Sequence, residues 1–376
     1  MLPADLPDTA GLLDLTDARS EASVTIVATS SPVPAEHGRV RIGLRNLIDD
    51  AERQLAEGDV PGASQRAVID PLRELLDEND PFWTHQSASL IIFASPERIE
   101  TFRLANAVED HASVGDRFDT GPLLRAITFP HRAFVLQLSK GEVRLSELGP
   151  DHRLIERPLA LPDDHHTILE RAENHGQADM PRPQGTTGDR LERERYCRVV
   201  QDELVKVVPK SIPVILAATT DLDPAYRAVN THPLLLEKGI DAHPDSLTER
   251  DIDGAARGIL DEHYAAELSD WRERFGSLRS EGLATSRIAE VAVAASAAGI
   301  DELLFNMDDT AEGTIDDYGR IEHADEPGPD TYVLVDEIAA RVLRSGGRAR
   351  AVRNKDLLDG SPVAATLRFP VPENAN

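Results

Sequence analysis

The sequence predicts an α/β protein, because amphipathic helices alternate with short apolar strands, most clearly toward the end of the chain. Two helices are predicted there, over residues 285–298 and 331–344, and glycines (Gly299 and Gly346) follow them. The strands predicted around them cover residues 300–305, 348–352 and 364–369. This order predicts a βαβ unit without visible catalytic residues. At 376 residues the chain is long enough for two or three domains.

The composition is that of a soluble protein with a large negative charge. The formal net charge is −27 and the mean hydropathy is −0.33. This charge disfavours non-specific nucleic-acid binding, so we expect no DNA partner, and any RNA contact must be local. No apolar run reaches the roughly 20 residues of a membrane helix, so no membrane partner is expected.

The compartment is predicted from the start of the chain and from its single cysteine. Residues 1–9 are acidic and lack the basic and apolar segments of a signal peptide. Cys197 alone excludes an internal disulfide and a cysteine-based zinc cluster. We expect a cytoplasmic protein, and no motif indicates a cofactor.

The first part of the chain predicts strands and two helices. The strands are expected over residues 25–29, 90–94 and 99–104. Residues 40–55 form one amphipathic helix. A second helix is expected to begin at Pro71 with Asp70 as its cap. This first domain is expected to end near Thr120.

The middle part predicts a hairpin, a long irregular segment, a helix and a strand. These elements are expected over residues 133–138 and 142–148 (hairpin), 149–188 (irregular), 189–208 (helix) and 213–218 (strand). Ser246 and Glu249 form a capping-box pattern, which predicts a helix from there to about Phe275.

Histidines concentrate in the irregular segment. His165 and His166 follow two aspartates, and His152 and His175 lie nearby. Imidazole and carboxylate groups are zinc ligands, so one hypothesis is a metal-assisted hydrolase that uses the His-rich loop 152–175. The other is an ordinary surface loop, because adjacent histidines on an extended chain point to opposite sides.

Residues 306–330 are strongly acidic and are expected to form a loop after a strand. Their aspartates include Asp308, Asp309, Asp316 and Asp317. The order of a calcium-binding EF-hand loop is missing. The segment is therefore a solvated loop or a surface that docks basic partners.

Short motifs spread over the chain resemble one family. They are residues 41–47 (RIGLRNL), 82–86 (FWTHQ), 118–124 (FDTGPLL), 134–139 (FVLQLS), 195–200 (RYCRVV), 213–217 (PVILA), 222–227 (LDPAYR), 346–347 (GG) and 364–369 (AATLRF). With these motifs the chain resembles the bacterial relatives of the archaeo-eukaryotic class-1 release factors and Pelota, a three-domain superfamily that acts at the ribosome.

The resemblance implies three domains. Residues 1–121 correspond to the codon-reading domain, 122–283 to a ribonuclease H-like middle domain, and 284–376 to a Pelota-type α/β domain that binds partners. It also implies that the ribosome or a translation factor is the partner.

Two family signatures are altered. Release factors carry Gly-Gly-Gln on the middle-domain loop, where this chain has His175-Gly176-Gln177, so Gln177 is the weak catalytic candidate. The linker between the first two helices, residues 57–62, is acidic instead of Asn-Ile-Lys-Ser, and mRNA phosphates would repel it. We therefore expect a non-catalytic, release-factor-like protein in ribosome rescue, hibernation or the stress response.

Overall fold

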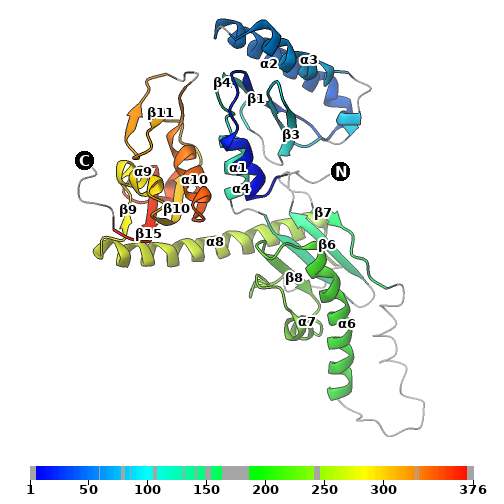
Figure 1. The fold of residues 1–376 in the computed structure, drawn as a ribbon. Coiled ribbons are helices and arrows are strands. Elements are labelled where there is room, and N and C mark those ends of the chain that lie inside the picture. The colour runs from blue at the N-terminus through cyan, green and yellow to red at the C-terminus, as the bar shows by residue number, and fades with distance from the viewer. Residues whose placement is uncertain are drawn as a thin grey trace. The chain divides into compact units, whose positions relative to one another are not determined.

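The computed structural model describes residues 6–370 except 59, 78–80, 85, 105–107, 130–131, 140–141, 149–153, 163–185, 241–245, 327 and 329, and of residues 186–189 only the backbone. The chain forms two compact units. The terminal unit joins residues 1–130 with 268–376, and the middle unit is residues 131–267. Both contain helices and a β-sheet (Figure 1), so the predicted α/β class is confirmed. Among the described residues, no helix combines the length and the apolar character needed to cross a membrane.

The N-terminal part of the terminal unit is an antiparallel sheet covered by helices. Its strands are β1 (Ser23–Thr29), β2 (Ser89–Ala94), β3 (Ile99–Leu104) and β4 (His111–Gly115), in the order β3-β2-β1-β4. Its helices are α1 (Thr9–Asp17), α2 (His37–Glu57), α3 (Gly62–Glu74) and α4 (Gly121–Thr128). The three strands and the first helix predicted from the sequence are confirmed.

The start predicted for the second helix is wrong. Helix α3 begins at Gly62, and Pro71 lies inside it instead of at its first turn. Proline removes one helical hydrogen bond. The helix continues past it because Val68, Ile69 and Leu72 are buried in the core beneath α2. Tertiary packing therefore outweighs the local cost of the proline.

Both faces of the N-terminal sheet are buried. Ile26 and Ile92 pack with the buried residues of α2 and α3. Val27 and Ile91, which are adjacent in sequence to Ile26 and Ile92, point to the other face. There they join a core that also contains side chains of the C-terminal part of the unit.

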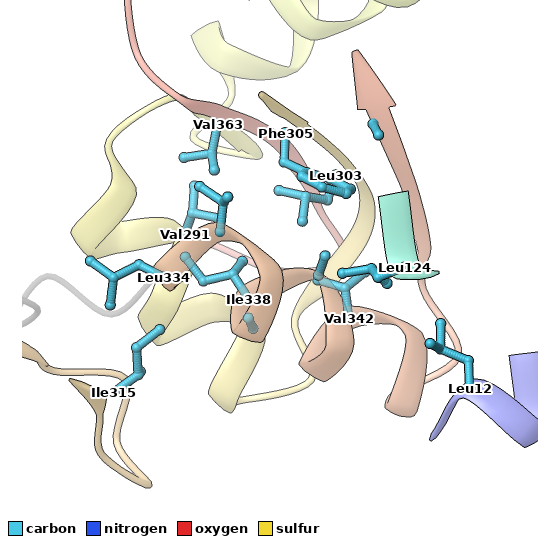
Figure 2. Packing of buried hydrophobic residues seen from close by; sticks show 14 of the residues in the cluster. Leu12, Leu124, Val291, Leu303, Phe305, Ile315, Leu334, Ile338, Val342 and Val363 are labelled. Carbon is cyan, nitrogen blue, oxygen red and sulfur yellow. The ribbon is translucent and has the colours of Figure 1, made fainter. Parts of the chain in front are cut away.

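The C-terminal part contains the predicted βαβ unit. Its elements are β9 (Ala284–Thr285), α9 (Ile288–Ser296), β10 (Ile300–Asn306), α10 (Leu334–Arg344), β14 (Arg348–Val352) and β15 (Val363–Leu367). Strands β10 and β14 are parallel and α10 lies between them in the chain, which confirms the prediction. Figure 2 shows Leu124 of α4 beside Val342 of α10, so the N- and C-terminal parts share one hydrophobic core.

The prediction that residues 306–330 form only a loop is wrong. They contain β11 (Glu312–Ile315) and β12 (Ile321–His323), which form a small sheet with β13 (Tyr332–Val333). Gly313 permits this sheet, because a Cβ there would lie 2.3 Å from the carbonyl oxygen of Glu322. The prediction followed the acidic composition of the segment and overlooked the apolar pair Ile315 and Ile321, which face each other across β11 and β12.

The middle unit is a four-stranded sheet with helices. Its elements are β5 (Phe134–Leu138), β6 (Val143–Leu148), β7 (Leu154–Arg157), α6 (Thr186–Val207), β8 (Val214–Ala218) and α7 (Asp223–Val229). The strand order is β7-β6-β5-β8, with β5 and β8 parallel and the other pairs antiparallel. Strand β7 lies in the segment that was predicted to be irregular, so that prediction is wrong for residues 154–157.

Helix α8 (Glu249–Ser280) contributes residues to both units. Its capping box is not the predicted Ser246 and Glu249. The Thr248 hydroxyl accepts a hydrogen bond from the Asp251 backbone N–H (3.3 Å), and the Asp251 carboxylate accepts one from the Thr248 N–H (3.1 Å). The same motif therefore occurs two residues later than predicted.

Candidate functional site

The histidine and glutamine candidates cannot be placed. His152, His165, His166, His175 and Gln177 all lie outside the described residues. Their metal-binding or catalytic use stays a prediction. Elsewhere, the described residues contain no group of three or more His, Cys, Asp or Glu side chains that could hold a metal ion.

The acidic candidates lie on and beside the β11–β12 hairpin and differ in role. Asp308 and Asp317 are exposed. The Asp316 carboxylate accepts hydrogen bonds from the backbone N–H groups of Arg320 (2.8 Å) and Tyr318 (2.9 Å), and these bonds lower the pKa of Asp316. Asp316 therefore shapes the turn, whereas Asp308 and Asp317 are presented to solvent. Partner binding by these residues stays a prediction.

A largely buried group of interacting ionisable side chains lies where the N- and C-terminal parts of the terminal unit meet, a contact that we call the seam. Arg125 of α4 donates to both carboxylate oxygens of Asp336 in α10, from Nε (3.1 Å) and from Nη2 (2.9 Å). Its Nη2 also donates to the carbonyl oxygen of Asp309 (2.8 Å). The Arg125 and Asp336 side chains are only 21% and 12% exposed, so this bidentate pair is largely withdrawn from water.

A second carboxylate approaches Asp336 from the N-terminal side. The carboxylate of Asp119 contacts Nε2 of His111 at 3.0 Å and accepts the backbone N–H of Gly121 at 3.1 Å. Gly121 is needed for this approach, because a Cβ at that position would lie 2.3 Å from Oδ2 of Asp336. The seam thus brings two aspartates together with one arginine and one histidine.

This crowding shifts three pKa values in the same direction. Burial raises the pKa of Asp336 to about 7, against the opposing effect of Arg125 and with a further increase from Asp119. Burial also raises the pKa of Glu312. The hydrogen bond from His111 to Asp119 raises the pKa of that imidazole. At Asp336 this shift brings the pKa of a carboxyl group close to neutral pH.

A cavity of about 140 Å³ lies beside these residues. Its lining includes Asp119, Glu312 and Asp336, together with Tyr332. It is large enough for a few water molecules. Since Arg125 occupies both oxygens of Asp336, this pair holds the two parts of the unit together.

Sequence reasoning did not find this cluster. Arg125 and Asp336 are 211 positions apart, and neither lies in a pattern that predicts a site. The Asp119–Gly121 segment did fall within one of the motifs that carry the family resemblance. A single sequence holds no signal that joins that motif to α10.

Comparison with known proteins gives a match between the middle of the chain and one family model. Residues 130–266, which nearly coincide with the middle unit, match the family model of a bacterial archaeo-eukaryotic release factor. That model describes bacterial archaeo-eukaryotic release factor family 11, and the match covers residues 130–266 alone. The predicted resemblance to the bacterial relatives of the release factor and Pelota superfamily is thereby confirmed. No curated protein matches the chain.

Solved structures of a translation termination factor and of Pelota-type proteins are similar to the chain at low identity. The archaeal termination factor aRF1 is 13% identical, with 96% of this chain and 97% of that one covered and a TM-score of 0.25. Pelota of Archaeoglobus fulgidus is 13% identical, with 99% of both chains covered and a TM-score of 0.30. Dom34 of S. cerevisiae is 14% identical, with 73% of this chain and 74% of that one covered and a TM-score of 0.40.

Proposed function

We propose that this protein is a release-factor-like factor that binds the ribosome without hydrolysing peptidyl-tRNA, in rescue, hibernation or the stress response. The observation that carries the proposal is the match of residues 130–266 to a bacterial release factor family. The ribosome and a translation factor are the partners that such a protein would have.

The arrangement of the middle unit supports a ribonuclease H-like domain. Three antiparallel strands, β5 to β7, are followed by β8, which pairs in parallel with β5. Residues 235 and 240 form single parallel bridges to β8 and extend the sheet beyond it. We propose the domain division 1–121, 122–283 and 284–376 on the family resemblance; the compact middle unit of the structure is narrower and covers residues 131–267.

The altered signatures support a role without catalysis. The loop of the middle domain carries His175-Gly176-Gln177 instead of Gly-Gly-Gln. Glu57 is the last residue of α2, directly before the linker to α3, and its carboxylate pairs with Arg53 at 3.3 Å. An acidic linker is unsuited to contact mRNA phosphates, so stop-codon reading is not part of the proposal.

Ribosome sedimentation tests the proposal. Tagged protein from growing and from stressed cells is expected to travel with ribosomal particles through a sucrose gradient. Absence from every ribosomal fraction, also after crosslinking, would overturn it. A peptidyl-tRNA hydrolysis assay on purified ribosomes tests the non-catalytic part, with Gln177→Ala as the matched control. Release of peptide by the natural protein and its loss in Gln177→Ala would show that the His-Gly-Gln segment is catalytic.

An adaptor role is the second candidate, and one observation favours it. Tyr318 is 80% exposed at the turn between β11 and β12, next to the exposed Asp317. Arg341 of α10 holds this turn by donating to the carbonyl oxygens of Asp316 (2.8 Å) and Ile315 (2.7 Å). A rigid exposed tyrosine with acidic neighbours fits a basic protein surface. Binding to such a partner should weaken with salt and with Tyr318→Ala, whereas Tyr318→Phe should retain most of it.

A further inference from the structure

Helix α2 is divided into a basic and an acidic half. Residues 37–48 contain three arginines and no Asp or Glu, whereas residues 49–57 contain four acidic residues and one arginine. The basic residues are Arg39, Arg41 and Arg45, and the acidic ones are Asp49, Asp50, Glu52 and Glu57. The division is notable in a chain with 67 acidic and 40 basic residues.

The acidic half is partly neutralised within the protein. Arg53 pairs with Asp50 and Glu57, and Arg73 of α3 pairs with Asp49 and Glu52. These pairs bring two guanidinium groups to four carboxylates on the outer side of α2 and α3.

The basic half keeps its positive charge at the surface. Among the described residues, Arg39 and Arg45 make no ion pair. The guanidinium of Arg41 lies over the ring of Trp83, 5.9 Å from the ring centre, which fixes its position. Arg39 and Arg45 are therefore a local excess of positive charge on a strongly negative protein, and Arg41 lies beside them on the same helix.

The folding of α2 does not explain this surface. Val40, Leu44 and Ile48 cover the sheet, whereas Ile42 is 59% exposed on the outer side of the helix. A Cβ at Gly38 or at Gly43 would meet no atom within 4 Å, so no internal contact requires these helix-weakening glycines. Arg39 in the first turn also opposes the helix dipole. Each feature costs helix stability or leaves apolar surface in water.

We propose that Arg39, Arg41, Ile42 and Arg45 form a surface that binds the phosphate backbone of RNA. This inference rests on the proposed function, since RNA is the polyanion that a ribosome presents. Arginine binds phosphate through two parallel hydrogen bonds, and Ile42 lies between the arginines where it can contact a ribose or base. The contact lies at the end of α2 opposite the acidic linker, which phosphates repel.

Charge removal with a matched control tests the surface. The double variant Arg39→Gln/Arg45→Gln removes two charges from it. The control Arg287→Gln/Arg320→Gln removes two charges from exposed residues elsewhere in the terminal unit. Affinity for purified ribosomes is measured between about 50 and 300 mM salt. The first variant should bind about tenfold more weakly at 100 mM and show a log–log salt slope shallower by about 1.5, while the control stays within about twofold of the natural protein.

A photocrosslinking amino acid in place of Ile42 identifies the partner class. Crosslinks to ribosomal RNA support the inference, and crosslinks to ribosomal protein alone overturn it. If the natural protein binds ribosomes and the double variant binds equally well, the proposed RNA-binding role of this surface is wrong but the proposed function stands. If the natural protein does not bind ribosomes but binds a labelled RNA hairpin through these arginines, the proposed function fails and the RNA surface stands. Binding to neither overturns both.

Discussion

Two buried carboxylates, Asp336 in the terminal unit and Glu147 in the middle unit, have neighbouring charges of opposite excess. The Glu147 side chain is 7% exposed and accepts hydrogen bonds from two guanidinium groups, those of Arg132 (2.8 Å) and Arg157 (3.1 Å). Among the residues that the structure describes, Asp336 pairs with Arg125 alone, and Asp119 adds negative charge beside it. One site thus has an excess of cations, and the other has an excess of anions.

The origin of the partners explains the difference. Arg132 and Arg157 lie 15 and 10 positions from Glu147 and belong to the β5–β7 region itself. Arg125 lies 211 positions from Asp336 and comes from the other half of the terminal unit. The pairs of Glu147 therefore stabilise a local meander, whereas the pair of Asp336 holds together two parts that are far apart in sequence.

The largest effect is expected from Arg125→Met. It leaves Asp336 buried without a counter-ion, which should lower the free energy of unfolding of the terminal unit by about 3 kcal/mol, because both side chains keep some exposure. The two tryptophans of the chain, Trp83 and Trp271, both lie in the terminal unit. Denaturant unfolding followed by tryptophan fluorescence therefore measures this unit.

Arg132→Met is the matched change in the middle unit. Glu147 keeps Arg157, so the cost should be about 1–2 kcal/mol. It should appear in circular dichroism and leave the tryptophan transition in place. Equal losses of unfolding free energy in Arg125→Met and Arg132→Met would show that the two carboxylates do not differ in their need for a counter-ion.

The charge state of the seam predicts a dependence of stability on pH. Burial gives Asp336 a pKa of about 7 in the folded state, above the ordinary value of 3.8, so the folded state binds an extra proton between these values. Stability gained by this proton is present at low pH and is lost as pH rises toward 7, by at most about 1.4 kcal/mol per pH unit. The raised pKa values of His111 and Glu312 act in the same direction.

The variant Asp336→Asn isolates the contribution of Asp336 to the pH dependence of stability. The asparagine cannot ionise, so the fall in stability between pH 5 and pH 8 should shrink by roughly 1–3 kcal/mol. Tryptophan-detected unfolding at several pH values measures it, and Glu312→Gln serves as the comparison at a half-buried carboxyl. An unchanged pH profile in Asp336→Asn would mean that Arg125 keeps Asp336 ionised throughout.

Steric contact at the seam gives a third prediction. Gly121→Ala places a Cβ 2.3 Å from Oδ2 of Asp336, whose side chain Arg125 holds in place, so about 1–3 kcal/mol should be lost. Gly43→Ala, in the same unit, meets no atom within 4 Å and should stabilise α2 by up to about 1 kcal/mol. If the change in the free energy of unfolding had the same sign in both variants, helix propensity would decide the result, and not the steric contact with Asp336.

The sequence predicted what depends on local pattern. The strands of the sheets and the parallel pair around α10 follow from apolar runs and their breaks, and most of these predictions agree with the structure. Errors occurred where long-range packing outweighs local signals. Pro71 marks a helix start in isolation, yet burial of Leu72 keeps it inside α3, and acidic residues hid the hairpin around Ile315. The Arg125–Asp336 pair depends on packing between distant parts, and no periodicity encodes such packing.

The smallest effect is expected at the exposed edge of the seam. Arg344 of α10 pairs with Asp17 at the end of α1, with its Nε 3.1 Å from Oδ1, and the two side chains are 38% and 55% exposed. Water and salt screen such a pair, so its coupling energy should be below about 1 kcal/mol. Asp17 also lies at a helix C-terminus, where a negative charge is unfavourable, and removing it recovers part of any loss.

A double-mutant cycle of Arg344→Ala and Asp17→Ala separates this coupling from the helix-end effects. We expect about 0.5 kcal/mol at 50 mM salt and almost nothing at 1 M, where the screening length falls to about 3 Å. The Arg125–Asp336 pair should lose much less of its contribution over the same range, because it is largely buried. A coupling above 2 kcal/mol at Arg344 would instead show that α1 is held mainly by charge. In the structure the buried Leu12 and Leu15 of α1 already fix it to the shared core, so the ion pair adds little.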